Sequence, residues 1–343
     1  MKHNSFSLFL HMLSVSVFAL LFLAGIAGEL RAEGGKDDSV TTFRVITPPD
    51  PNFIPMSVLR AKAGEWMPGV EVELVMVPSG DPSTMRAMLY SRAADFALFS
   101  VPGGSRFVDS GITNLSLVGV HVWKGVHLLA QESVGSVREL DGQRLIAVPA
   151  VMTPSHMVAK HALHLEGVNA DFTSGRGGPV LMARLSSPGS APLGFVAPEP
   201  MVSIILRRQQ KENWPVRYKV LMDLQAVASP RTGETPLGGL WVVEPGRVRA
   251  NKDAARTFVD GFRRAVDYAD DPRHVEEVAD IVSGAMKEVY GQRASPAVYR
   301  SMLKSPRLRL DFRDARAVEK VVVKELKRIY GVVVDEKVFR SVF

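Results

Sequence analysis

A short apolar run that stops at a proline and passes directly into a helix pattern is the feature that most constrains this fold. The clearest copy is Asp95–Ser100, which ends at Val101-Pro102-Gly103-Gly104. Proline suits a helix's first turn, because its fixed φ fits there and the N–H it lacks would be unbonded anyway. A buried strand that leads into such a helix is half of a βαβ unit. The same order recurs at Ile54-Pro55, Asp81-Pro82, Thr153-Pro154, Gly178-Pro179 and Glu199-Pro200.

These repeated junctions predict an α/β fold with parallel strands. In open α/β sheets the ligand binds beyond the carboxyl ends of the strands, where helix N-termini present free N–H groups. We therefore expect the six prolines to gather around one ligand cleft ringed by helix N-termini.

Length and composition narrow the class of protein. A chain of 343 residues suggests two domains of ordinary size. The absence of cysteine excludes disulfides, thiolate metal sites, cysteine nucleophiles and a lipid-modified N-terminal cysteine. The net charge of +6 comes without a basic-aromatic stretch, so a solvated basic face is favoured over nucleic-acid binding.

The N-terminus has the pattern of an export signal. Lys2 precedes an apolar run from Phe6 to Ala27, and small residues follow up to Ala32. We predict a signal peptide over residues 1–32 and a mature protein in the periplasm. The run is long for a signal, so an uncleaved anchor remains the alternative.

The order of the remaining elements suggests two lobes. Residues 43–125 and 238–343 are expected to form the first lobe, and residues 131–225 the second. Val126–Ala130 is interpreted as the first crossing between them, and Gly238–Val243 as the strand that returns to the first lobe.

Three segments carry a resemblance to a known family. They are Met88–Ala97, with its Ala-Asp-Phe-Ala end, Val137–Val148, and Met182–Pro200, with its Pro-Glu-Pro end. In order and spacing they resemble the extracytoplasmic substrate-binding proteins of ABC importers, in the branch that serves nitrate, sulfonates, taurine and thiamine-pyrimidine precursors. The "G-x-vDa" sequence common in that family is replaced here by Pro188–Gly194, which leaves the ligand open.

The resemblance implies a type II-like periplasmic binding protein fold, with two α/β lobes, two crossing segments and a ligand cleft between the lobes. It implies a monomer that binds a small polar or anionic organic molecule and presents it to an ABC permease in the inner membrane, without a cofactor or catalysis. The alternatives are an enzyme on the same fold and a periplasmic sensor domain.

Several candidate ligand contacts lie at helix starts. Thr153, Ser155 and His156 could bind an anionic oxygen, although Thr153 could equally be a plain N-cap. Gly103 and Gly104 could let a ligand approach the backbone, or could simply form a turn.

Other candidates come from strand ends and loops. Trp123, beside His121, could cover an apolar part of the ligand, or it could be a buried hinge aromatic. Arg176 could bind an anion, although a surface loop is favoured. Glu199 could accept from an amine, or be an ordinary first-turn acid. The complete set of predicted ligand-binding residues is Asn52, Phe53, Pro102, Gly103, Gly104, His121, Trp123, Thr153, Ser155, His156, Arg176, Glu199 and Gly238.

Metal binding and catalysis find little support in the sequence. His161 and His164 are three residues apart on a predicted helix, but no further ligand at suitable spacing completes a metal site. The sequence also lacks a serine elbow, an HExxH motif and a paired-carboxylate signature.

Overall fold

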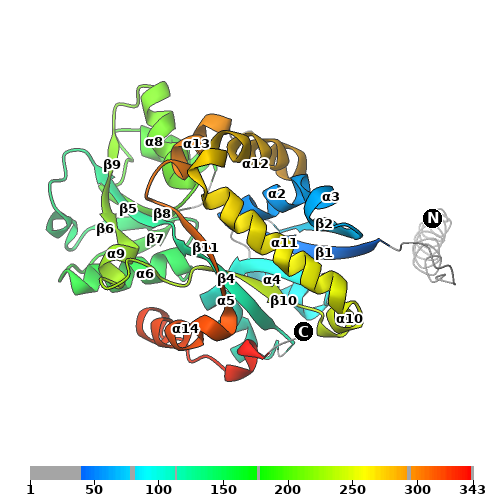
Figure 1. The fold of residues 1–343 in the computed structure, drawn as a ribbon. Coiled ribbons are helices and arrows are strands. Elements are labelled where there is room, and N and C mark those ends of the chain that lie inside the picture. Colours follow the sequence, from blue (N-terminus) through cyan, green and yellow to red (C-terminus); the bar gives the residue numbers. More distant parts are fainter. Residues whose placement is uncertain (1–39, 78–81, 113, 176–177, 292–294, 341–343) are drawn as a thin grey trace, which may run out of the picture. The chain divides into compact units, whose positions relative to one another are not determined.

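The computed structural model describes residues 40–77, 82–112, 114–175, 178–291 and 295–340 of the chain. The predicted signal peptide, Asp81 of the Asp81-Pro82 junction and the predicted anion contact Arg176 lie outside the described residues. The described part is a mixed α/β structure with two sheets, as predicted (Figure 1).

The first sheet has the strand order β11-β4-β10-β3-β1-β2. Strands β1, β2 and β3 are parallel, whereas β10 runs antiparallel to both β3 and β4. Strand β4 therefore runs in the same direction as β3, and β11 pairs antiparallel with its outer side. The strands are β1 (Thr41–Thr47), β2 (Val70–Met76), β3 (Phe96–Ser100), β4 (Ser116–Lys124), β10 (Gly238–Val242) and β11 (Arg309–Asp314).

Apolar helix faces cover this sheet. Phe258 of α11 lies 4.5 Å from Phe96 of β3, measured between ring centroids, and Phe43 of β1 meets Phe96 edge-on at 5.3 Å. Helix α11 presents an apolar face to the core, because Phe258, Phe262, Val266 and Ala269, which recur at helical spacing, are all buried. The helices in this part are α2 (Phe53–Ala61), α3 (Ala63–Trp66), α4 (Pro82–Tyr90), α5 (Val101–Asp109), α10 (Pro245–Ala250), α11 (Lys252–Asp270), η2 (Pro272–His274), α12 (Val275–Tyr290), α13 (Pro296–Leu303), α14 (Ala315–Tyr330) and η3 (Glu336–Phe339).

The second sheet has the order β7-β6-β8-β5-β9, with β6 parallel to β7 and β8. Alternate residues of its strands enter different apolar clusters, as the pleat requires: Val196 packs with α6, whereas its neighbour Phe195 packs with α8. The elements are β5 (Val126–Gln131), η1 (Val137–Leu140), β6 (Arg144–Ala147), α6 (Pro154–Leu165), β7 (Asp171–Ser174), α7 (Pro179–Ser186), β8 (Gly194–Pro198), α8 (Met201–Lys211), β9 (Tyr218–Asp223) and α9 (Leu224–Ala228).

The two sheets are joined at Gly125. Strand β4 ends one residue before it and β5 begins one residue after it. The prediction that Val126–Ala130 is a crossing segment is therefore wrong, because these residues pair with both β8 and β9 inside the second sheet. A short, mostly apolar extended run has the same appearance in sequence whether it joins two lobes or lies inside a sheet.

The strand pairings place the carboxyl edges of both sheets at this junction. Lys124 is at the carboxyl end of β4 and hence of its parallel neighbours. Val126 pairs with Pro198, at the carboxyl end of β8, because β5 runs antiparallel to β8. Helices α2, α4 and α5 begin at the first edge, and α6, α7 and α8 at the second. The proline-marked helix starts thus lie at the edges that the sequence predicted.

Among the described residues, no helix combines the length and the apolar character that a membrane span requires.

Candidate functional site

The start of α5 is a capped helix N-terminus at the first carboxyl edge. The Ser100 hydroxyl accepts a hydrogen bond from the Gly103 N–H at 3.2 Å, and Pro102 is buried in the first turn. A Cβ on Gly103 would lie 2.5 Å from the Ser100 Oγ, so the glycine leaves room for this cap. A Cβ on Gly104 would lie 2.2 Å from the ring of Trp241. Packing against Trp241 therefore explains Gly104 without a ligand.

The loop after β1 places Asp50 and Asn52 beside Gly238 of β10. The Asn52 side chain donates from Nδ2 to Oδ1 of Asp50 at 2.7 Å, and its backbone N–H donates to the same oxygen at 2.9 Å. The Asn52 Oδ1 is buried without a hydrogen-bond partner, and a Cβ on Gly238 would come within 2.2 Å of it. Gly238 lies opposite Ser100 in the sheet, so this loop adjoins the start of α5.

Asp50 is the residue of this loop that sequence reasoning missed. Burial raises the pKa of its carboxyl to about 7, against the lowering effect of the two hydrogen bonds from Asn52. Its residue nevertheless keeps some accessible surface. The adjacent Phe53 is buried and meets Tyr290 edge-on at 5.3 Å, and the Tyr290 hydroxyl donates to the carbonyl of Thr47. The Pro-Pro-Asp-Pro-Asn composition predicted a loop, but not this carboxyl environment.

The start of α6 differs from the start of α5. The Thr153 hydroxyl donates to the Ala150 carbonyl at 2.7 Å and makes no cap to the helix, so the N-cap reading of its side chain is wrong. The Nδ1 of His156 accepts from the Met152 N–H at 3.0 Å, while burial lowers the pKa of the ring. In the neutral ring the hydrogen is then on Nε2. Ser155 and His156 are both largely buried.

Arg106 of α5 connects the two helix starts. Its Nη1 donates to the Met152 carbonyl, just before α6, at 3.4 Å, and its Nη2 donates to the Tyr330 carbonyl at the end of α14 at 3.3 Å. Sequence reasoning missed this residue as well, because an arginine on the outer face of a short helix carries no distinguishing pattern.

Glu199 lies in a closed ion-pair network. Its side chain is fully buried, and Oε1 accepts from Arg307 Nε at 2.7 Å and from the Ser203 hydroxyl at 3.1 Å. Oε2 accepts from the Ser203 N–H at 3.1 Å, and the Arg307 carbonyl accepts from His127 Nε2 at 2.9 Å. These partners use the carboxylate within the protein, which argues against the predicted contact with a ligand amine.

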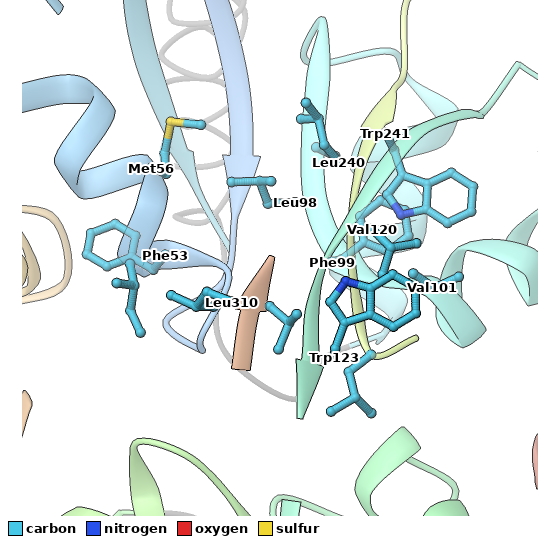
Figure 2. Close-up of a cluster of buried hydrophobic side chains, with 14 of the residues drawn as sticks. Phe53, Met56, Leu98, Phe99, Val101, Val120, Trp123, Leu240, Trp241 and Leu310 are labelled. Carbon is cyan, nitrogen blue, oxygen red and sulfur yellow. The ribbon is translucent and has the colours of Figure 1, made fainter. Parts of the chain in front are cut away.

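His121 and Trp123 are interior residues of β4. Both ring nitrogens of His121 are buried without partners, burial lowers its pKa to about 3, and Phe262 meets the ring edge-on at 5.1 Å. Trp123 is 1% exposed, donates from its indole N–H to the Asp311 carbonyl at 2.8 Å, and lies 4.1 Å from the Arg313 guanidinium. Figure 2 shows Trp123 among buried apolar side chains. The contacts favour the alternative of a buried aromatic over a ligand cover.

The predicted site residues therefore fall into separate groups. One cluster at the first carboxyl edge joins the β1 loop to the start of α5, and Arg106 links it to a second cluster at the start of α6. Glu199 lies in the network with Arg307, and His121 and Trp123 lie in the core. The first cluster contains Asn52, Phe53, Pro102, Gly103 and Gly238, and the second contains Thr153, Ser155 and His156.

A groove of about 440 Å³ lies elsewhere, at the amino end of β4. Leu117, Val118, Asp260 and Arg263 are among its lining residues. It is on the edge of the first sheet opposite the helix starts described above.

In sequence, the chain matches no protein-family profile and no curated protein. In structure it is similar to several solved proteins. A structure of an ABC transporter protein from Parabacteroides distasonis matches with a TM-score of 0.64 and 15% identity, over 88% of this chain and 99% of that one. The periplasmic aliphatic sulphonate binding protein SsuA of Escherichia coli matches with a TM-score of 0.64 and 16% identity, over 85% and 88%.

The alkanesulfonate-binding protein SsuA of Xanthomonas axonopodis pv. citri, bound to MOPS, matches with a TM-score of 0.60 and 14% identity, over 89% of this chain and 96% of that one. A protein from Candida albicans described as having the generic periplasmic binding protein fold matches with a TM-score of 0.58 and 16% identity, over 87% and 93%. Identities this low establish the architecture and not the ligand. The chain has the two-lobed α/β fold of the periplasmic binding proteins.

Proposed function

We propose that this protein is the extracytoplasmic solute-binding component of an ABC importer, which captures a small polar or anionic organic molecule and presents it to a membrane permease. The observation that carries this proposal is the meeting of two carboxyl edges at Gly125, with helix starts from both sheets. In α/β proteins this is where ligands bind, against the free N–H groups of helix N-termini.

In this proposal residues 43–125 and 238–343 form the first lobe and residues 131–225 the second, to which β5 is added. The lobes would close over the ligand because it contacts both of them and so favours the closed state. Arg106 supports this mechanism, since its guanidinium bridges from α5 to the Met152 carbonyl before α6.

The proposed ligand contacts are the two clusters joined by Arg106. Gly103 and the start of α5 would line one side, where the Val101 and Gly103 N–H groups already donate to the Leu237 carbonyl and the Ser100 hydroxyl. Ser155 and the Nε2–H of neutral His156 would supply donors on the other side, beside Thr153, whose hydroxyl already donates to the Ala150 carbonyl. Donors at the start of α6 suit an anionic oxygen, and two structural neighbours are described as sulfonate-binding proteins. Sulfonates are therefore the ligand class to test first.

We also propose that the protein is exported through residues 1–32 and acts without catalysis. The deep acids Glu199 and Glu325 are engaged with arginines, and His121 is buried without a polar partner, so none of them is placed to act on a substrate.

The test begins with protein purified from the periplasm. Native mass spectrometry should detect a co-purified small molecule, and intact mass should show a mature chain that begins between Gly28 and Gly34. Melting temperatures are then measured with taurine, ethanesulfonate and MOPS. A ligand at a hundred times its Kd should stabilise the protein by about 2.7 kcal/mol. A chain that carries no small molecule and responds to no anion would contradict the proposal.

A further inference from the structure

Among the described residues, the buried acids Asp95, Glu199 and Glu325 each have an arginine partner. Asp95 pairs with Arg247 at 3.3 Å and also accepts from the Arg44 N–H. Glu199 pairs with Arg307, and Glu325 pairs with Arg328. A carboxylate removed from water is costly unless a cation or several hydrogen bonds compensate its charge. The protein follows that rule at each of these three positions.

Asp50 is partly buried and has no such cationic partner among the described residues. Asn52 supplies both of its hydrogen bonds, and both go to Oδ1. Within the described part of the chain, no lysine, arginine or histidine lies within ion-pair distance of Asp50, and Oδ2 receives no hydrogen bond. Burial is the largest cause of the raised pKa of its carboxyl, yet the residue keeps accessible surface. Among the described residues, its second oxygen therefore has no compensating group, and the residue is partly accessible from outside.

The position of Asp50 makes this oxygen relevant to the proposed site. It lies in the loop after β1, at the carboxyl edge where α2 and α5 begin. Burial raises the pKa of the Tyr290 phenol, and the charge of the neighbouring Asp50 raises it further. Tyr290 in turn packs edge-on against Phe53. A carboxylate beside an aromatic ring is a suitable environment for an organic ammonium group.

We propose that Asp50 accepts a protonated nitrogen of the ligand, so that the ligand carries an amine or amidine as well as its anionic group. This inference rests on the proposed function and narrows it to zwitterionic solutes. Asn52 and Gly238 are positioning residues. The Asn52 amide fixes Oδ1 and leaves Oδ2 free, and Gly238 leaves the room that the Asn52 amide oxygen occupies.

The experiment uses pairs of anions that differ by an amine. Calorimetric titrations compare taurine with ethanesulfonate and β-alanine with propionate, on the wild type, Asp50→Asn and Asp260→Asn. Asp260 is an exposed acid at the groove on the opposite edge, so it controls for the loss of one negative charge. In at least one pair the amine-bearing member should bind about tenfold or more tightly, the value of one charge-assisted hydrogen bond.

Asp50→Asn should abolish this affinity difference within the pair, the margin, and leave the affinity for the amine-free anion unchanged. Asp260→Asn should keep the margin. Gly238→Ala should reduce the margin as well, because it displaces the amide that orients Asp50. Equal affinity within every pair, an unchanged margin in Asp50→Asn, or no binding of either amine-bearing probe would overturn the assignment.

Mass spectrometry of the co-purified molecule separates this inference from the proposed function. A bound molecule without a basic nitrogen would overturn the role of Asp50 and leave the solute-binding function standing. A bound molecule with a basic nitrogen, lost from Asp50→Asn protein, would support both.

Discussion

Two loops at the carboxyl edges are similar in sequence, but their acidic residues have different surroundings in the structure. The loop after β1 holds Asp50 between prolines, and the loop after β8 holds Glu199 between prolines. Glu199 is fully buried and its charge is matched by Arg307. Among the residues that the structure describes, Asp50 is hydrogen-bonded by Asn52 alone. One acid is thus compensated within the fold, and the other is left for an outside partner.

The difference teaches that an acid in the loop before a helix start is not by itself a sign of a ligand. Arg307 belongs to the segment between α13 and β11, so its pairing with Glu199 fastens that segment to the second sheet. Asp50 contributes no such fastening. If this comparison is right, mutation of Glu199 should destabilise the fold, and mutation of Asp50 should not.

The largest expected effect is at Glu199. Glu199→Ala leaves the Arg307 guanidinium without its buried partner and should lower the free energy of unfolding by about 3–5 kcal/mol. Urea denaturation measures this. The double variant Glu199→Ala/Arg307→Ala should recover part of the loss, because no unpaired charge then remains. A loss below about 1 kcal/mol would mean that the network is not structural.

Asp50→Asn should have the opposite sign. The folded-state pKa of Asp50 is raised to about 7, so between pH 4 and pH 7 the folded protein binds more protons than the unfolded chain. Its ionisation therefore lowers stability as the pH rises through this range. At pH 8 the variant should be more stable by about 1–3 kcal/mol, allowing for partial solvation, and near pH 4 the difference should vanish. Urea denaturation at several pH values tests this, and a destabilised variant at pH 8 would remove the contrast with Glu199.

The two helix starts joined by Arg106 offer a smaller test. Ser100→Ala removes the cap on Gly103 and should cost about 1 kcal/mol. Thr153→Val removes only the hydrogen bond to the Ala150 carbonyl and should cost about half as much. Hydrogen exchange should become faster at the Gly103 amide in Ser100→Ala, with no matching change in the first turn of α6 in Thr153→Val. Faster exchange there would restore the capping role of Thr153.

The smallest effect is expected at His161, whose Nε2 contacts Arg328 Nη1 at 3.0 Å across α6 and α14. Burial and the nearby Arg328 lower the pKa of His161, whereas Glu325 acts to raise it. A lowered histidine pKa gives stability that is complete above the unfolded-state pKa and is lost as the pH falls from that value through the folded-state pKa. His161→Ala should cost about 0.5 kcal/mol at pH 8 and less at pH 5. Thermal melts at both pH values measure this, and a larger cost at pH 5 would contradict it. The pH trend is opposite to that of Asp50.

The sequence alone determined the elements and their order. The apolar run of Phe96–Ser100, the proline at the start of α5 and the periodic faces of α11 and α12 are set by side-chain spacing and backbone φ preferences, which act within a few residues. Because parallel strands with intervening helices leave their carboxyl ends on one edge, the location of the helix starts followed from the same pattern. The resemblance to importer binding proteins pointed to a fold that the structural neighbours share.

The tertiary structure decided which side chains are free. The partner of Glu199 lies 108 residues away at Arg307, and that of Trp123 lies 188 residues away at Asp311. No short-range pattern encodes such pairings, because they depend on how whole elements pack. The sequence equally gives no sign that Asp50 lacks a cationic partner among the described residues. Any of many distant residues could have supplied one. Local chemistry therefore predicted the edge at which a ligand would bind, and long-range packing decided which acid there is left without a partner.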